Sequence, residues 1–368
     1  AGVSISPVLN NNGVIGKAKD ARNQYAEAQT NDEKQLNEVS DWIDAKVGNT
    51  TGGGSDYNPA SEGVPIPDGF YYVGGTKDSG LVISDNANDK DKYKGQETVG
   101  TDLDGNQFVW IPVENIADYK RTAYSSNVAT GITDTTTNSE KINLYSTSDS
   151  QYVTEALPED EKTSVEKNKG YYIGRYEAGD KESTEATPPT FRTSSSSTSN
   201  TITVKAGQAP YNYIKYTDAK SLAEGFSGKQ GYTSVTSKLV SSYAWDTAIA
   251  FIQKTNSDYG SSSEEGNYKD SSTFTYTGIA DTETNKQTKE NGTSTLTPTG
   301  QTTAVNNIYD MGGNVFEWTS ELSSYKDMYY VVRGGSCYDN ITNCPAGYRT
   351  DSSRGAGYAD TFRITLFL

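Results

Sequence analysis

The chain has 368 residues and not one histidine. Histidine provides the base of Ser-His-Asp and Cys-His catalytic groups, ligands of catalytic zinc centres and two ligands of a common non-haem iron site. None of these sites can be built here, so we expect no zinc cofactor. Basic residues are also in the minority, with 32 Lys and Arg against 48 Asp and Glu. Because binding to nucleic acid requires clustered basic residues, we expect no nucleic-acid partner.

Long apolar runs and cysteines are scarce as well. Apolar residues make up 33% of the chain, and no window holds 18 uncharged apolar residues. We therefore expect no membrane-spanning segment within it. Cys337 and Cys344 lie seven positions apart near the C-terminus. One such pair is no disulfide framework, and the sequence leaves its redox state open.

Tyrosine and glycine, by contrast, are abundant, with 27 and 35 copies. Tyrosine combines a large apolar ring with a polar tip, which is typical of adaptable binding surfaces. Short β-type runs bounded by Gly, Pro, Asn or Asp predict strands at 70–73, 81–83, 108–111, 171–173, 202–204 and 329–332. Helical periodicity predicts helices at 217–226 and 242–255. The Ser/Thr-rich tracts 180–201 and 255–300 are predicted to be long surface loops, because they are too polar to bury.

The first 62 residues have a different character. Apolar residues at three- and four-residue steps predict one long amphipathic helix within 1–47, running from residue 18 to 47. The glycine-rich stretch 48–62 is predicted to be a flexible linker. The prediction is a small α+β domain with heavy loops at 63–368, preceded by a helix.

Two motifs in the C-terminal third carry a family resemblance. They are Ile308-Tyr309-Asp310-Met311-Gly312-Gly313-Asn314-Val315-Phe316-Glu317-Trp318 and Val332-Arg333-Gly334-Gly335-Ser336. Together with upstream matches at 170–177, 210–219 and 237–246 and Phe362-Arg363, they resemble the formylglycine-generating-enzyme (sulfatase-modifying factor) family. The resemblance covers 63–368 and implies a C-type-lectin-like fold.

The first motif has a structural and a metal-binding interpretation. A buried turn with two glycines and a tryptophan needs no ligand. In the family, however, the matching positions bind a structural calcium ion. Carried over, the ligands are the side chains of Asp310 and Glu317 and the backbone carbonyls of Gly313 and Val315. Such oxygen ligands suit Ca²⁺.

The family's enzymes bind copper through two cysteines that follow the second motif. Cys344 matches the second of these positions, but Asp339 stands at the first, and Cys337 is out of register. We therefore expect no copper and no catalysis. The cysteines are predicted to be surface residues or a disulfide that closes a short loop.

Relatives of this fold without catalysis include the variable proteins of diversity-generating retroelements. In those proteins the C-terminal segment binds the ligand, which predicts a ligand-binding segment at 337–361 here, alongside the plain alternative of an ordinary polar loop. Its Tyr, Asn, Asp and Thr resemble antibody paratopes and are largely reachable by changing adenines in Asn or Tyr codons. The candidate contacts for a protein or glycan ligand are Cys337, Tyr338, Asp339, Asn340, Thr342, Asn343, Tyr348, Thr350, Asp351, Tyr358 and Asp360.

Residues 1–6 and 10–18 resemble the end of the apolar segment of Gram-positive type IV pilin-like proteins. That resemblance implies an extracellular location at the cell surface, anchored through an apolar half-helix that this chain does not contain, with other pilin-like subunits as partners. The predicted function is a displayed, non-catalytic, adhesin-like binding protein, with possible retroelement diversification. A structural pilin subunit and a copper-dependent oxidase are the alternatives.

Overall fold

The computed structural model describes residues 56–122, 140–143, 152–195, 201–261, 265–280, 286–322, 330–352 and 356–368. The predicted helix at 18–47 and most of the predicted linker lie outside these residues. By its internal contacts the chain divides after Asp56, and the second unit, Tyr57–Leu368, is called the head below. The head begins before the predicted boundary at residue 63. Its first element is a short 3-10 helix, η1 (Pro59–Glu62), which Asn58 caps.

A six-stranded sheet forms the centre of the head. Its strands, in spatial order, are β1 (Tyr71–Gly74), β2 (Val82–Ser84), β3 (Gln107–Pro112), β6 (Gly170–Gly174), β17 (Ile364–Phe367) and β10 (Thr236–Leu239). All neighbouring strands run antiparallel. The last strand of the chain therefore lies inside the sheet, between two strands from earlier in the sequence.

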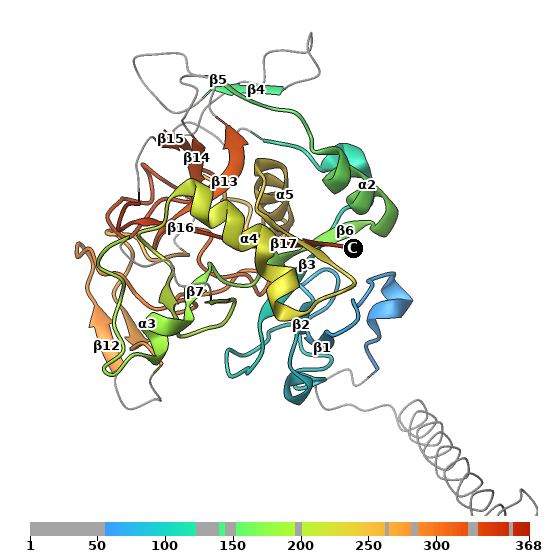
Figure 1. Ribbon diagram of the computed structural model, residues 1–368, viewed down its shortest axis with the longest axis horizontal. Helices are drawn as coiled ribbons and strands as arrows, with labels where there is room; N and C mark the ends of the chain where they lie inside the picture. The colour runs from blue at the N-terminus through green and yellow to red at the C-terminus, as the bar shows by residue number, and fades with distance from the viewer. Residues whose placement is uncertain are drawn as a thin grey trace, which may run out of the picture. The chain divides into compact units, whose positions relative to one another are not determined.

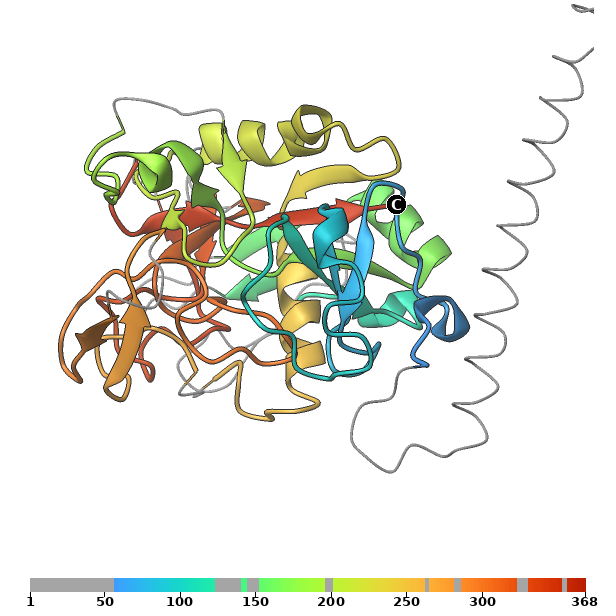
Figure 2. The same ribbon diagram turned by 90° about the horizontal axis from the view of Figure 1, so that it is seen from below.

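Both faces of this sheet are buried. Successive side chains of a strand point to opposite faces, so Phe108 and Trp110 of β3 pack on one side and Val109 and Ile111 on the other. Helix α4 (Tyr216–Gln230) covers the first side and helix α5 (Ser242–Ile252) the second. Figure 2 shows the two helices on opposite sides of β17. Two-sided burial explains why these strands read as nearly continuous apolar runs.

A second sheet of four strands carries both family motifs. Its order is β15 (Arg349–Ser352), β14 (Tyr330–Arg333), β13 (Phe316–Leu322) and β16 (Asp360–Phe362). Strands β13 and β16 pair in parallel, with Phe316 opposite Asp360 and Trp318 opposite Phe362. The predicted ligand-binding segment consequently connects β14 to β15 and β15 to β16 in this sheet, at one end of the head (Figure 1).

Smaller elements complete the described residues. They are the 3-10 helices η2 (Ala87–Asp89) and η3 (Ile116–Asp118), the helices α2 (Glu159–Asn168) and α3 (Lys181–Glu185), and the strands β4 (Glu140–Asn143), β5 (Tyr152–Glu155), β7 (Gly179–Asp180), β8 (Ile202–Thr203), β9 (Ala209–Pro210), β11 (Phe274–Thr277) and β12 (Lys286–Lys289). None of the described helices is long and apolar enough to cross a membrane.

The α+β prediction is confirmed, but the prediction of two polar surface loops holds only in part, because most described residues of each tract are at least partly exposed, yet each tract contains regular elements and buried polar residues. The tract 180–201 contains α3 and a buried ion pair between Asp180 and Arg192. The tract 255–300 contains the β11–β12 hairpin and the fully buried Asn267. Polar side chains are buried here because each finds hydrogen-bond partners, which removes most of the cost of leaving water.

Candidate ligand-binding face and its buried frame

The turn Arg333-Gly334-Gly335-Ser336 joins β14 to the predicted ligand-binding segment. Gly335 has φ +72°, and a Cβ built on it would lie 2.2 Å from the backbone oxygen of Cys344. Side chains at this position are excluded both by the backbone conformation and by this close approach. The glycine thus lets the segment fold back onto its own later residues.

A buried ion network holds the segment from below. Asp246 of α5 accepts hydrogen bonds from Arg333 (Nη2 to Oδ1, 2.5 Å) and from Arg349 (Nη2 to Oδ2, 2.6 Å). The two arginines lie opposite each other on β14 and β15, and all three side chains are fully buried. One carboxylate therefore fixes helix α5 to the two strands that bracket the 334–348 loop.

Glu321 of β13 extends this network. It accepts from Arg349 Nε (3.1 Å) and from Arg121 Nη1 (2.8 Å), and it also bonds the Ser242 hydroxyl. Three guanidinium groups and two carboxylates are thus buried together, with a formal charge of +1. Such a network specifies one arrangement of its elements, because a change that removes one partner leaves a charge unpaired in the interior.

The loop that follows the turn is closed by Asp339. Its Oδ2 accepts from the Ser336 backbone N (3.0 Å) and the Ser336 hydroxyl (2.5 Å). The thiol of Cys344 also hydrogen-bonds to this carboxylate. The side chains of Asn340, Thr342 and Asn343 remain exposed along the loop. These contacts fix the backbone of a loop that carries three exposed, neutral polar side chains.

Two tyrosines stand out on the surface beside this loop. Tyr338 is 42% exposed and Tyr358 is 47% exposed, and no other large hydrophobic side chain among the described residues is as open to solvent. Their ring centroids lie 4.8 Å apart at an angle of 88°. Positions 20 residues apart in sequence therefore form one edge-to-face aromatic pair. We call Tyr338, Asn340, Thr342, Asn343 and Tyr358 the exposed face.

Three of the predicted contact residues are wrong, because their side chains are buried. Cys337 is inaccessible, and its backbone N donates to Asn314 O. Tyr348 is 9% exposed, packs against Phe316 and accepts at its carbonyl from Arg333 Nε. Asp360 is 3% exposed within β16.

The other predicted contacts divide into two groups. Asp339 and Thr350 are half-buried, so part of each side chain reaches solvent. The side chain of Asp351 lies outside the described ones. Arg333 and Arg363, which belong to the motifs that carry the family resemblance, are fully buried.

Sequence reasoning missed a neighbour of the exposed face. Tyr213, in the loop between β9 and α4, has its ring centroid 6.3 Å from that of Tyr358. Its backbone N donates to Gly357 O (2.9 Å), and the adjacent Asn212 Nδ2 donates to Tyr358 O (3.0 Å). From the sequence we predicted only that this segment precedes the helix at 217–226. No local pattern there indicates a partner almost 150 residues away.

The two cysteines are free thiols, and both are buried. The prediction of surface cysteines or a disulfide is therefore wrong. Burial raises the pKa of Cys337 to about 12 and raises that of Cys344 further. The thiolate is the form that binds metal and reacts. With Asp339 at the position of the family's first copper ligand, the chain offers one thiol where a two-thiolate copper site needs two.

Four buried charged groups lie in the first motif or next to it. Glu317 forms a two-point ion pair with Arg363 (2.9 Å to Nε, 2.6 Å to Nη2). Asp310 Oδ2 accepts from Gly300 N (2.6 Å), and Glu177 Oε1 accepts from Asn314 Nδ2 (2.5 Å). Glu177 Oε2 has no hydrogen-bond partner although it is buried. Three carboxyl groups thus face one guanidinium.

Burial dominates the electrostatics of this group. It raises the pKa of Asp310 to about 6, and it raises that of Glu317 against the opposing effect of Arg363. The pKa of Glu177 is raised well above its ordinary value, by burial first and by the charges of Asp310 and Glu317 next. A buried excess of negative charge is the environment that a cation would relieve.

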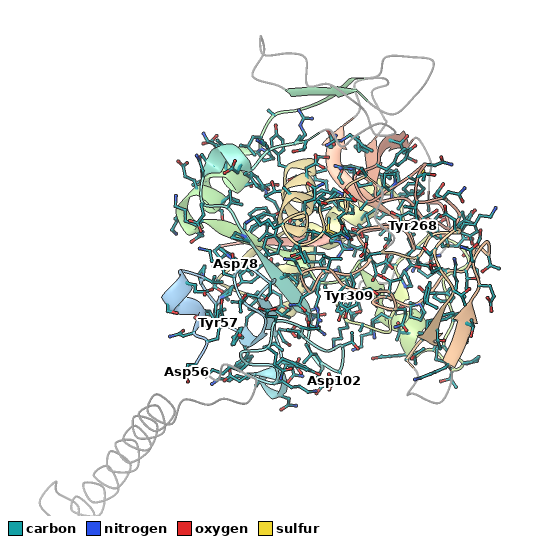
Figure 3. The ribbon with its side chains drawn as sticks, turned by 180° about the vertical axis from the view of Figure 1, so that it is seen from behind. Asp56, Tyr57, Asp78, Asp102, Tyr268 and Tyr309 are labelled. Atoms are coloured by element: carbon teal, nitrogen blue, oxygen red, sulfur yellow. The ribbon has the colours of Figure 1, made fainter. Side chains whose placement is uncertain are left out.

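The predicted calcium ligands supply oxygen donors, but two observations restrict them, the first being that both Glu317 oxygens already accept from Arg363. Among the residues described, no group of three or more His, Cys, Asp or Glu side chains is arranged to hold a metal ion. The Asp310 and Glu317 carboxylates would therefore need the backbone carbonyls of Gly313 and Val315, as the resemblance implies. Oxygen donors of this mixed kind are those that Ca²⁺ takes. Figure 3 labels Tyr309, which precedes Asp310, and Tyr268, which lies toward the second sheet.

Comparison with known proteins gives a family assignment. Residues 120–364, about two thirds of the chain, match the Sulfatase-modifying factor enzyme 1-like domain. No curated protein matches the sequence.

Solved structures that resemble the chain include PvdO from Pseudomonas aeruginosa (15% identity, 74% of this chain and 98% of that one, TM-score 0.37) and CarF (13%, 70% and 98%, 0.37). Treponema denticola variable protein 1 is similar too (12%, 74% and 98%, 0.35).

Proposed function

The chain belongs to the Sulfatase-modifying factor enzyme 1-like domain family, and we propose that it is a non-catalytic member that binds a ligand through its C-terminal segment. One observation carries the proposal. The exposed tyrosines Tyr338 and Tyr358 contact each other on the surface, above a frame in which Arg333, Arg349 and Asp246 are fully buried. A rigid frame beneath exposed aromatic and small polar side chains is the organisation that binding sites need.

Catalysis of the family's copper-dependent kind has less support. That chemistry uses two thiolates, whereas this chain offers Asp339 and the buried neutral thiol of Cys344. The Asp339 carboxylate is moreover engaged by Ser336 at two points. A binding role needs neither group to react.

Diversification by a retroelement remains part of the proposal. A process that changes side chains without unfolding the protein must act on exposed positions and spare buried ones. Deep sequencing of the 333–363 coding region across a population of the source is the test. We expect substitutions at Tyr338, Asn340 and Tyr358, and none at the buried Tyr348. A reverse-transcriptase gene and a near-copy of this region should lie nearby. Substitutions spread evenly over exposed and buried codons, or an invariant segment, would refute diversification.

Display outside the cell on a pilin-like stalk is proposed from the resemblance of residues 1–18 alone. Protease treatment of intact cells should release the head if it is displayed, while a cytoplasmic marker stays protected. A head that survives treatment of intact cells and is cleaved only after lysis would contradict display.

A structural Ca²⁺ ion at the first motif is also proposed. It is supported by the formal excess of two negative charges in the group Glu177, Asp310, Glu317 and Arg363, and by the unpartnered Glu177 Oε2. When bound, the ion would neutralise buried carboxylates and fix the turn from β13 to the preceding loop. It would have no part in ligand binding.

A further inference from the structure

Tyr213 occupies a backbone conformation that is uncommon for its type. Its φ is +52°, in the left-handed region that bulky side chains rarely adopt. Strain of this kind persists only where surrounding contacts impose it, and such residues cluster at functional sites.

A chain of largely buried hydrogen bonds holds the loop that contains Tyr213. Asp180 binds Arg192 (Oδ2 to Nη1, 2.9 Å), and Arg192 Nε donates to Asn212 O (2.8 Å). Asn212 in turn donates to Tyr358 O, and Tyr213 N donates to Gly357 O. The chain ties the β9–α4 loop to the backbone of the C-terminal segment. Both acceptors in this segment are backbone carbonyls, so these hydrogen bonds do not involve the side chain at position 358.

The three tyrosine rings form one aromatic cluster whose ring planes are tilted steeply to one another. Tyr358 lies between the other two, with Tyr338 at 4.8 Å and 88° and Tyr213 at 6.3 Å and 49°. Tyr213 is half-buried, as expected for a ring at the edge of this cluster. We call these rings the tyrosine platform.

Charged residues border the tyrosine platform, since Asp339 beside Tyr338 is half-buried and Asp270 Oδ1 accepts from Ile341 N. The side chains of the exposed face themselves are neutral. Each side chain of the exposed face is a phenol, an amide or a hydroxyl, on a chain whose formal charge is −16. A protein partner would require about 800 Å² and 20–30 residues on each side. A sugar ring needs less, since its C–H face stacks on an aromatic ring and its hydroxyls exchange hydrogen bonds with amides and phenols.

We propose that Tyr213 is a fixed member of the binding face and that the tyrosine platform binds a neutral saccharide. The proposal rests on the proposed function and adds to it a residue outside the C-terminal segment and a ligand class. The variable side chains would select among saccharides, while Tyr213 supplies a constant stacking surface.

The test uses the full chain on an array of neutral oligosaccharides with their sialylated and sulfated counterparts, followed by calorimetric titration of the strongest neutral binder. We expect neutral glycans to bind above charged ones. Tyr213→Asn should weaken binding at least about tenfold, as Tyr338→Ala should. The melting temperature should stay unchanged, because Asn tolerates positive φ. Tyr213→Phe should bind like the wild type, and so should Tyr71→Ala, which removes a half-buried tyrosine from β1.

Each of the following outcomes would refute one part of the proposal. An array without a neutral ligand, or with charged glycans or only a protein bound, refutes the saccharide assignment. Wild-type affinity in Tyr213→Asn with lost affinity in Tyr338→Ala refutes the role of Tyr213 and leaves the proposed function standing. Wild-type affinity in both variants refutes the exposed face itself.

Discussion

The buried carboxylate of Asp246 offers the sharpest test of how the binding segment is held. It bonds Arg333 at 2.5 Å and Arg349 at 2.6 Å, and all three side chains are inaccessible to solvent. The substitution Asp246→Asn keeps the shape of the side chain but removes its charge. It raises the formal charge of the network from +1 to +2 and leaves Arg333 without a carboxylate partner.

The expected cost follows from that unpaired charge. Removing one partner of a buried ion pair lowers the free energy of unfolding by about 3–5 kcal/mol. In a head of this size, about 1 kcal/mol corresponds to roughly 2 °C, so the melting temperature should fall by about 6–10 °C. Because Arg333 also bonds the carbonyl of Tyr348, amide hydrogen exchange should accelerate in 336–348 before it does so in the central sheet.

Calorimetry and hydrogen exchange on the folded variant measure both effects. Asp258→Asn is the matched control, since Asp258 is exposed and its loss should change the free energy of unfolding by no more than about 0.5 kcal/mol. The double variant Asp246→Asn with Arg349→Met should lose less than the sum of the single changes, because the two residues share one interaction. A melting temperature of Asp246→Asn within about 2 °C of the wild type would refute the view that this network fixes the segment.

The remaining predictions concern the metal, the turn and the thiols. Chelation should lower the melting temperature of the wild type but not of Asp310→Asn, because Ca²⁺ at a hundredfold its Kd adds about 2.7 kcal/mol; equal responses would exclude the site. With chelator present, the urea concentration at the unfolding midpoint should fall as the pH rises from about 4 to about 6. The reason is that Asp310, with a pKa of about 6 in the folded state, keeps a proton that the unfolded state releases near 3.8. A midpoint that rises over this range would contradict the prediction. Gly335→Ala should unfold the head, whereas Gly207→Ala, at φ +71° in open space, should cost only about 1 kcal/mol; equal melting curves would show that the 2.2 Å approach is unimportant. Cys337 and Cys344 should resist Ellman's reagent until denaturant is added, and Cu(I) with a sulfatase-type cysteine peptide should give no product; rapid labelling or turnover would contradict the buried, non-catalytic thiols.

Regular elements were predictable because their burial follows a period. The runs that became β1, β2, β3 and β6 are apolar on both faces, and the helical stripe of 242–255 contains α5. At Gly335 only glycine fits the observed backbone, so the residue type agrees with the turn found there. The absence of histidine, a fact of composition alone, excluded whole classes of catalytic site.

Irregular segments follow no such period, so tertiary contacts decided where their side chains lie. Within one loop the chain exposes Tyr338 and buries Cys337, and nothing in their order distinguishes them. We predicted exposed loops at 180–201 and 255–300 because these tracts are polar. Whether a polar side chain is buried depends on its partners in the folded chain, as the pair Asp180 and Arg192 shows.

The composition and motifs of the sequence by themselves determined the family, the α+β class, the excluded chemistries and the segment that carries the candidate face. The tertiary structure alone brought Tyr213, Tyr338 and Tyr358 together. It did so because backbone hydrogen bonds at Gly357 and Tyr358 join loops that are almost 150 residues apart in the chain.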